Sequence, residues 1–247
     1  HLYRDRHDAG KNLTLHYGDL SDGSRLVSLI AELKPHEIYN LGAQSHVRVS
    51  FDEPEYTGDI TGVGTTRVLE AVRLVSPESR FYQASSSEMF GATPPPQDED
   101  TPFYPRSPYG AAKVYSYWMT KNYREAYDLF AVNGILFNHE SYLRGENFFI
   151  KKLIHGALDI LNGKEEFLEF GNLDIKRDFG WSEKYVEAMW LMLQQDKPED
   201  FVICSGTSLT LREIVHYVFD KLKLDRNLIR INPKYFRPTE ILDIYGS

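Results

Sequence analysis

Tyr109 and Lys113 stand four residues apart in the stretch SPYGAAK, which reads as the start of a helix. An i, i+4 spacing puts both side chains on one helical face. A tyrosine serves as an acid–base group only when its pKa, near 10 for the free side chain, is lowered. A neighbouring ammonium would lower it by stabilising the phenolate, and each pKa unit requires roughly 1.4 kcal/mol. The pair is therefore a candidate proton-transfer site, although such a spacing also arises often by chance.

Ser86 and Glu88 lie two residues apart at the end of an apolar run, RFYQASSSEMFG, so their side chains should point the same way. Packing would favour an apolar residue at position 88, and a carboxylate at the end of a buried strand is more often a working group. The Ser86 hydroxyl and the Tyr109–Lys113 pair could hold and deprotonate a sugar hydroxyl while hydride leaves its carbon. The accepting nicotinamide would add a cation that favours phenolate. The combination indicates a site of the short-chain dehydrogenase type.

Strands and helices alternate along the part of the chain that carries these motifs. Apolar runs predict strands, and apolar residues at helical spacing predict helices of about 12 residues or more between them. This order predicts right-handed crossovers and an α/β fold with a doubly wound parallel sheet. Strands with their turns are predicted at 12–20, 37–45, 80–91 and 129–138, and helices at 21–34 (capped by Ser21), 52–75 and 107–128.

Ligands of such sheets bind beyond the carboxyl ends of the strands. One edge should then carry the strand-end residues Asp19, Leu41, Gly42, Ala43, Ser45, Ser86, Glu88 and Asn138. After Asn138 the alternation changes, which indicates a smaller, interleaved substrate domain. We predict a dinucleotide-binding domain over 1–140 plus about 172–206, and a substrate domain over about 141–171 plus 207–247.

A dinucleotide-binding sheet normally begins with a strand and a G-x-G-x-x-G-type turn. The first twenty residues contain no such turn, and GVGTT at 62–66 lies inside a helical pattern. The predicted fold is therefore Rossmann-like but lacks its first strand and glycine-rich turn in this chain. If the 247 residues were the whole molecule, cofactor affinity should collapse, because the pyrophosphate would lose its helix N-terminus. The abrupt start and the end at ILDIYGS favour a longer molecule with intact activity.

The composition excludes several classes of protein. A formal charge of −8 argues against a general nucleic-acid surface. The sequence contains no run of about 18 apolar residues, so no membrane-spanning segment is predicted. The single cysteine, Cys204, allows neither a disulfide nor a cysteine-rich metal site. The eight histidines show no metal-ligand spacing. We expect a cytoplasmic protein without a metal and without nucleic-acid or membrane partners.

Longer motifs are more specific than Y-x-x-x-K. The sequence resembles the GDP-mannose 4,6-dehydratase family, among the extended short-chain dehydrogenases/reductases, in HYGDL, YNLGAQSHVRVSF, YQASSSEMFG, TPFYPRSPYGAAK, NGILFNHES, LRGEN, GNLDIKRDFGW and YFRPTE. The similarity runs from about His16 to Glu240, and NHES, KRDFGW and YFRP are its most specific parts.

The resemblance implies a hydro-lyase reaction, the dehydration of GDP-mannose to GDP-4-keto-6-deoxymannose with a tightly held NADP in preference to NAD. Hydride leaves C4 of the sugar while Tyr109, assisted by Ser86, takes the hydroxyl proton. Glu88 then removes the C5 proton and helps to expel the C6 hydroxyl as water, and hydride returns to C6. A simple dehydrogenase needs no second acid–base group, whereas a dehydratase does, which accounts for Glu88.

The resemblance also implies the ligand contacts and a GDP-sugar as the small-molecule partner. The cofactor contacts match Asp19, Leu20, Leu41, Gly42, Ala43, Ser45, Tyr56, Tyr109, Lys113, His139 and Arg144. The substrate contacts match Ser45, Ser86, Glu88, Asn138, Lys152, Arg177, Arg237 and Glu240. Arginine forks can neutralise a diphosphate, and a carboxylate can accept hydrogen bonds from guanine or ribose.

The sequence departs from the family pattern beside this site. Tyr142 and Leu143 follow NHES, where the family usually has proline and a basic residue before the position of Arg144. In the family that loop reaches a neighbouring subunit, so the resemblance implies a homodimer or homotetramer without fixing which. Ser86 stands where threonine is frequent, which keeps the hydroxyl but adds rotamer freedom.

Other interpretations stay open at this point. The same reaction could act on another GDP-sugar such as a GDP-heptose, and an epimerase or decarboxylase of the same fold carries a similar site. A catalytically inactive sugar-nucleotide-binding module is the non-enzymatic alternative. Single residues also have plain structural explanations: a solvated face for Lys152, an ion pair with Asp178 for Arg177, a loop anchor for Arg237 and a hydrogen-bonded core edge for His139.

Overall fold

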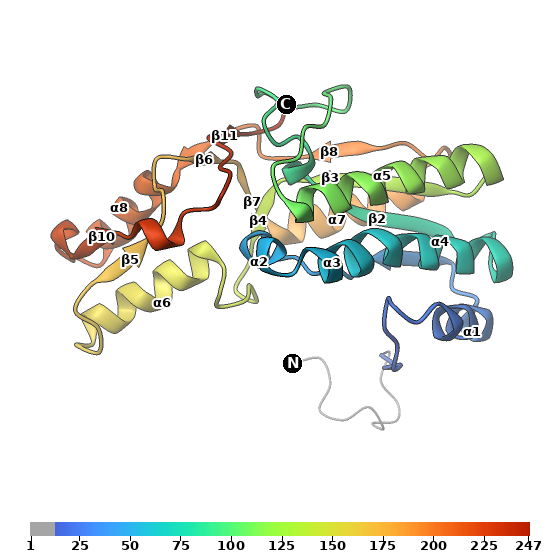
Figure 1. The fold of residues 1–247 in the computed structure, drawn as a ribbon, viewed down its shortest axis with the longest axis horizontal. Coiled ribbons are helices and arrows are strands. Elements are labelled where there is room, and N and C mark those ends of the chain that lie inside the picture. Colours follow the sequence, from blue (N-terminus) through green and yellow to red (C-terminus); the bar gives the residue numbers. More distant parts are fainter. Residues whose placement is uncertain (1–12) are drawn as a thin grey trace.

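The computed structural model describes residues 13–247 of the chain. Figure 1 shows two lobes, a larger one built on a parallel sheet and a smaller one that holds α6 and α8. The sheet of the larger lobe has four parallel strands in the order β1-β2-β3-β8. Its strands are β1 (Glu37–Asn40), β2 (Arg80–Ser86), β3 (Ala131–Leu136) and β8 (Phe201–Ile203).

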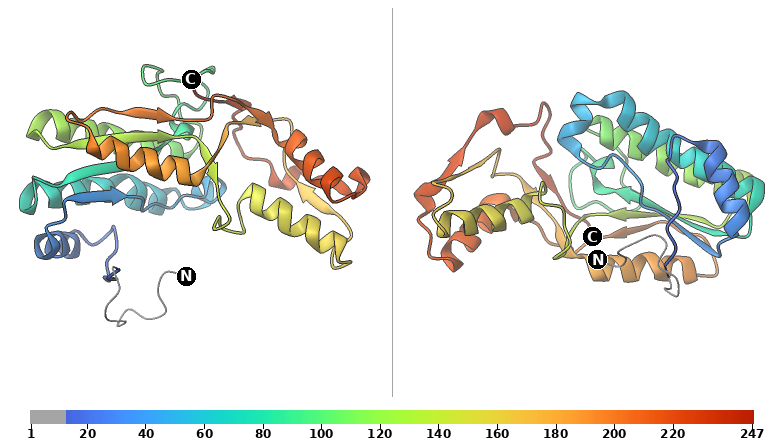
Figure 2. Two further views of the ribbon diagram at one scale, coloured as in Figure 1. Left: turned by 180° about the vertical axis from the view of Figure 1, so that it is seen from behind. Right: turned by 90° about the horizontal axis from the view of Figure 1, so that it is seen from below.

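Helices cover both faces of this sheet (Figure 2). Phe81 of β2 is buried among side chains of helices on one face, whereas its neighbour Tyr82 packs against Tyr185 and Met189 of α7 on the other. Successive strand residues point to opposite faces, so a strand that is apolar at both positions is covered twice. The predicted α/β fold with a doubly wound parallel sheet is confirmed. The covering helices are α1 (Gly23–Leu33), α4 (Gly64–Val75), α5 (Pro108–Tyr127) and α7 (Ser182–Gln194).

Side-chain caps fix where two of these helices begin. The Ser107 hydroxyl accepts a hydrogen bond from the Gly110 N–H at 3.0 Å, and Pro108 occupies the first turn, so α5 starts just before Tyr109. Asp22 caps α1 by accepting from the Arg25 N–H at 2.9 Å. The predicted Ser21 cap is wrong by one residue, because the Ser21 hydroxyl donates to Asp19 instead.

The strand predicted at 12–20 is also wrong over its described part, 13–20, which is irregular. Residue 12 lies outside the described residues. Alternating apolar residues give a segment strand propensity, but its backbone N–H and C=O groups still require a partner. Within residues 13–247 no strand pairs with this segment, and β1 pairs with β2 alone.

The connection from β1 to β2 is helical for most of its length. It contains α2 (Val47–Asp52), α3 (Pro54–Thr57), the π-helical η1 (Gly58–Val63) and α4. The predicted helix at 52–75 is therefore present, with a π-helical middle. The GVGTT motif falls within η1 and α4 rather than in a strand-to-helix turn, as its helical pattern predicted.

The smaller lobe has its own apolar core between α6 (Phe149–Leu161), α8 (Leu211–Lys221) and β5 (Leu168–Phe170). β5 pairs with β10 (Ile229–Ile231). Short strands join this lobe to the sheet: β4 (Asn138–Glu140) pairs with β7 (Phe179–Trp181), and β6 (Lys176–Arg177) lies between β9 (Leu209–Thr210) and β11 (Asp243–Ile244). The residue ranges of the two domains stay a prediction.

The end of the chain returns to the larger lobe. Gln97 donates its N–H to the Tyr245 carbonyl at 2.9 Å, and the Thr239 hydroxyl donates to the Arg106 carbonyl at 2.8 Å. Gln97 and Arg106 belong to the long loop that follows β2, and Thr239 and Tyr245 come after Arg237 in the chain. This return brings Arg237 to the carboxyl end of β2.

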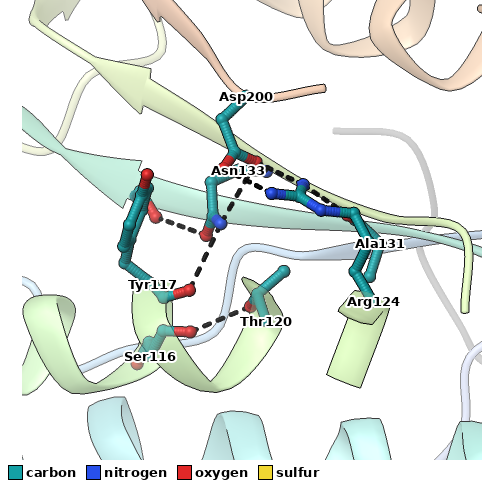
Figure 3. A network of polar contacts seen from close by, with 8 residues as sticks. Ser116, Tyr117, Thr120, Arg124, Ala131, Asn133 and Asp200 are labelled. Carbon is teal, nitrogen blue, oxygen red and sulfur yellow. Dashed lines mark hydrogen bonds and ion pairs between the residues drawn. The ribbon is translucent and has the colours of Figure 1, made fainter. Parts of the chain in front are cut away.

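A buried polar network fixes β2, β3 and α5 relative to one another (Figure 3). The Asp200 carboxylate accepts hydrogen bonds from Arg124 of α5 at 2.8 and 2.9 Å, and from the Asn133 N–H of β3 at 2.7 Å. The Ser85 hydroxyl of β2 donates to the Asn133 side chain at 3.0 Å. The residue before Ser86 is thereby tied to the neighbouring strand and, through it, to α5.

Candidate active site

A cleft with a volume of about 700 Å³ opens at the carboxyl ends of β1, β2 and β3. The start of α5, the segment after β4, one side of α7 and Arg237 complete its walls. Eleven of the predicted site residues line it: Leu41, Ala43, Ser45, Ser86, Glu88, Tyr109, Lys113, Asn138, His139, Arg144 and Arg237. The prediction that ligands bind beyond the carboxyl ends of the strands therefore identified residues that are distant in the sequence but line one cleft.

Ser86 and Glu88 enter the cleft from the end of β2. Ser86 keeps extended backbone angles, and its hydroxyl accepts the Glu88 N–H at 3.2 Å, which starts the short 3-10 turn η2 (Ser87–Met89). Ser87 and Met89 are buried, and the Glu88 side chain, which is partly exposed, lines the cleft. Glu88 Oε1 lies 3.6 Å from Arg237 Nη1. A Cβ on Gly110 would come within 2.8 Å of the Glu88 carbonyl, so glycine lets α5 approach this turn.

Tyr109 and Lys113 lie on the first turns of α5 and are both buried. The Lys113 ammonium donates to the Ala84 carbonyl at 2.7 Å, and its Nζ is 5.7 Å from the centre of the Tyr109 ring. Burial lowers the pKa of Lys113 to about 8.

Burial raises the pKa of Tyr109 to about 12, although a contact with the Ser86 hydroxyl and the charge of Arg144 act in the opposite direction. The charge of Glu88 adds to the rise. The lowered pKa expected from the sequence is therefore wrong for the protein alone, because burial of the phenol dominates. Phenolate at Tyr109 requires further positive charge in the cleft.

His139 and Arg144 form the wall contributed by β4 and the loop after it. His139 Nδ1 is 2.9 Å from the Phe137 carbonyl, and its ring stacks on Tyr185 with 4.7 Å between ring centres. Burial lowers the pKa of His139. The Arg144 guanidinium lies 3.6 Å from the centre of the Phe148 ring, and its Nε is 3.5 Å from Glu140 Oε2.

Arg177 is buried and Glu240 is partly buried next to the cleft, and neither lines it. Arg177 donates to the Ile241 carbonyl at 2.9 Å, and its Nη2 lies 3.9 Å from Glu240 Oε1. Burial lowers the pKa of Arg177 and raises that of Glu240. The partner of Arg177 is thus Glu240 and not Asp178, whose carboxylate accepts the Ser205 and Gly206 N–H groups.

The remaining predicted residues lie outside the cleft lining. Leu20 packs against Gly42, where a Cβ would come within 2.7 Å of the Leu20 side chain, and Asp19 is exposed beside them. Tyr56 is 52% exposed on α3. Lys152 lies on α6 with its Nζ 5.0 Å from the centre of the Tyr235 ring.

The donors on the cleft floor fit a nicotinamide nucleoside. Lys113 has three N–H groups, and within the described residues one of them donates to the Ala84 carbonyl. The other two are available to ribose hydroxyls, beside a phenol on the same helical face. By contrast, no group of three or more His, Cys, Asp or Glu side chains within residues 13–247 is placed to hold a metal ion. The helices of this part of the chain are all too short or too polar to cross a membrane.

His46 is among the cleft-lining residues that sequence reasoning missed. Its ring lies 6.0 Å from that of Phe148, centre to centre, and it lines the cleft with Arg237 and Glu88. The motif SHVRVSF contains it. Its place directly before an apolar stretch, where helices are capped, was the available signal.

Sequence comparison decides the family. The sequence model described as GDP-mannose 4,6 dehydratase matches residues 1–247. The chain belongs to the GDP-mannose 4,6-dehydratase family. It is 51% identical to the GDP-mannose 4,6 dehydratase of Homo sapiens, with all of this chain and 72% of the relative covered. It is 47% identical to the GDP-mannose 4,6-dehydratase of Sinorhizobium fredii, with 100% and 76% covered.

Solved structures of the wider fold superpose closely on this family member. RMD from Pseudomonas aeruginosa, complexed with NADPH, gives a TM-score of 0.83 at 24% identity and covers 94% of this chain and 78% of its own. The dTDP-glucose 4,6-dehydratase DesIV from Streptomyces venezuelae, with NAD and TYD bound, gives 0.84 at 22% identity, covering 98% and 73%. At these identities the likeness shows the fold alone.

Proposed function

We propose that this chain is a hydro-lyase that dehydrates GDP-mannose to GDP-4-keto-6-deoxymannose with NADP. The observation that carries the proposal is the common cleft of Glu88 and Tyr109 in a member of this family. Oxidation of a sugar hydroxyl needs one proton acceptor. Elimination of water needs a second group that takes a carbon-bound proton, and Glu88 is placed to be that group.

Tyr109 takes the proton of the C4 hydroxyl in the first step. Ser86, in contact with the phenol, holds the same sugar oxygen. Since burial raises the pKa of Tyr109 to about 12, the phenolate depends on the Lys113 ammonium and on the cofactor's positive charge. NADP, when bound, would supply that charge and serve as acceptor of the C4 hydride and as its donor to C6.

Glu88 acts in the elimination that follows. The C4 ketone acidifies the C5 proton, Glu88 removes it, and the resulting carboxylic acid gives a proton to the departing C6 hydroxyl. Arg237, 3.6 Å from the carboxylate, orients it. The cofactor is regenerated, so one bound molecule serves many turnovers.

The ligand contacts divide between the two lobes. For NADP we propose Ala43, Ser45, His139 and Arg144 in the cleft wall, Leu41 at its rim, and Asp19, Leu20, Gly42 and Tyr56 beside β1 and on α3. For the GDP part of the substrate we propose Asn138, Lys152, Arg177, Arg237 and Glu240. The preference for NADP over NAD rests on the family resemblance, and one structural neighbour holds NADPH while others hold NAD.

Turnover of GDP-mannose by the protein with its cofactor tests the proposal. Mass spectrometry and NMR of the product should show loss of one water, a deoxy C6, a keto C4 and, in deuterated water, deuterium at C5. Release of carbon dioxide or an inverted stereocentre would instead identify a decarboxylase or an epimerase. Faster turnover of a GDP-heptose would change the substrate, and absence of turnover with every GDP-sugar would favour a binding module.

Two properties beyond the site belong to the same proposal. We expect a homodimer or homotetramer, because Tyr115 and Trp118 are 42% and 53% exposed on one face of α5. Analytical ultracentrifugation measures this directly. We also expect the enzyme in the cytoplasm, and a fluorescently tagged full-length protein in its source cells tests that.

A further inference from the structure

His46 stands in the cleft wall without a role in the chemistry described above. His46 precedes α2 as its N-cap residue, and its ring lies 6.0 Å from that of Phe148, centre to centre, in the lining of the cleft. The backbone of His46 is held on both sides by Gln44, since its N–H donates to the Gln44 side chain at 2.7 Å and its carbonyl accepts from that side chain at 3.3 Å. The imidazole therefore has a defined position.

The cap of α2 fixes which ring nitrogen carries the proton. His46 Nδ1 accepts the Val49 N–H at 3.4 Å, so Nδ1 has no proton of its own while this bond exists. A neutral imidazole must then carry its proton on Nε2. Burial and the charges of Arg237 and Arg48 lower the pKa of His46, which agrees with a neutral ring. The ring can therefore donate a hydrogen bond from Nε2. To accept one there it would have to carry its proton on Nδ1, which would break the bond from the Val49 N–H.

We infer that His46 is a substrate-binding residue that donates the Nε2 hydrogen to an oxygen of the sugar-diphosphate part of the GDP-sugar, next to Arg237. This rests on the proposed function. A sugar diphosphate presents hydroxyl and phosphate oxygens, and a neutral N–H donor pairs with both. Arg237, whose charge is felt at the ring, draws those oxygens to this wall.

His46→Ser separates this contact from the helix cap. Serine is a strong N-cap residue, so the cap of α2 remains, but the hydroxyl is too short to replace Nε2–H. Isothermal titration calorimetry with the NADP-loaded protein should show GDP-mannose bound about tenfold more weakly by the variant, the size of one hydrogen bond near 1.4 kcal/mol. KM should rise by a similar factor with kcat changed little, since the contact is made before and during the reaction.

Titration with GDP alone tells which oxygen is the acceptor. Equal weakening for GDP and GDP-mannose assigns a phosphate oxygen, and weakening for GDP-mannose alone assigns a hexose oxygen. Either result supports the inference. The matched control is His36→Ser, at the far end of β1 from the cleft, which should bind both ligands as the wild type does.

The thermal unfolding midpoint and the bound NADP of His46→Ser should equal those of the wild type, which excludes a folding defect. Unchanged affinity and KM for GDP-mannose in a folded His46→Ser would overturn the inference. The proposed function would still stand in that case, provided that the wild-type protein converts GDP-mannose. A wild type that neither binds nor converts GDP-mannose would defeat the proposed function itself.

Discussion

Arg237 Nη1 lies 3.6 Å from Glu88 Oε1, so the arginine proposed for the diphosphate also holds the carboxylate proposed for proton transfer. Both side chains are largely shielded, with 29% and 13% of their areas exposed. In such surroundings an ion pair is screened less than at the surface. A second anion that binds Arg237 must therefore share it with Glu88.

Replacement of Arg237 by glutamine should weaken the binding of GDP by about 2 kcal/mol, or roughly thirtyfold in Kd, because a charge-assisted hydrogen bond to phosphate is lost. Arg237→Lys should lose less affinity for GDP but should still orient Glu88 poorly, since an ammonium lacks the planar fork. Isothermal titration with GDP measures both. The control Arg226→Gln, in an exposed pair with Asp220, should leave GDP binding unchanged. Wild-type affinity for GDP in Arg237→Gln would refute the assignment.

Glu88→Gln should separate the oxidation of C4 from the elimination. The amide cannot take the C5 proton, so formation of the keto-deoxy product should slow by about a hundredfold to ten thousandfold. Tyr109, Ser86 and Lys113 remain, so the absorbance of NADPH should rise after GDP-mannose is mixed with the enzyme and should persist. Stopped-flow absorbance with product analysis tests this. Glu55→Gln, on α3 outside the cleft, is the matched control.

We expect the charged side chain of Lys113 to lower the stability of the folded protein and yet to be required for catalysis. Its pKa falls from 10.5 to about 8 on burial, which corresponds to about 3 kcal/mol against the charged form at pH 7. The unfolded chain binds the proton more tightly, so this penalty is full below pH 8 and fades as the pH rises towards the unfolded pKa near 10.4. Cofactor-free Lys113→Met should therefore unfold at higher urea concentration than the wild type at pH 7, while its turnover of GDP-mannose is lost.

A pH series extends the test of Lys113. The stability difference between the variant and the wild type should shrink from pH 8 to pH 10. Equal or lower stability of Lys113→Met at pH 7 would show that the hydrogen bond to the Ala84 carbonyl outweighs the cost of burying the charge.

The sequence predicted the cleft because its main residues obey local rules. Ser86 ends β2, and Glu88 and Asn138 come shortly after parallel strands, while Tyr109 and Lys113 lie at the start of a capped helix. The topology alone therefore brings them together. What it could not predict depends on contacts between distant segments. Burial of Tyr109, the pairing of Arg177 with Glu240 and the absence, within residues 13–247, of a strand paired with 13–20 are properties of the packed molecule.

Asp200 should support the site from a distance through the network that holds β2 and β3 together (Figure 3). Asp200→Asn leaves the Arg124 guanidinium, with 14% of its side chain exposed, without its carboxylate. Removal of one partner of a buried pair destabilises a protein by about 3–5 kcal/mol. Urea unfolding should show a loss of this size. The matched control is Asp174→Asn, whose exposed pair with Arg212 should leave the unfolding curve in place.

Because Ser85 bonds to Asn133, the folded Asp200→Asn protein should also lose kcat more than affinity for GDP-mannose. Unchanged stability together with unchanged kcat would show that the network does not position Ser86.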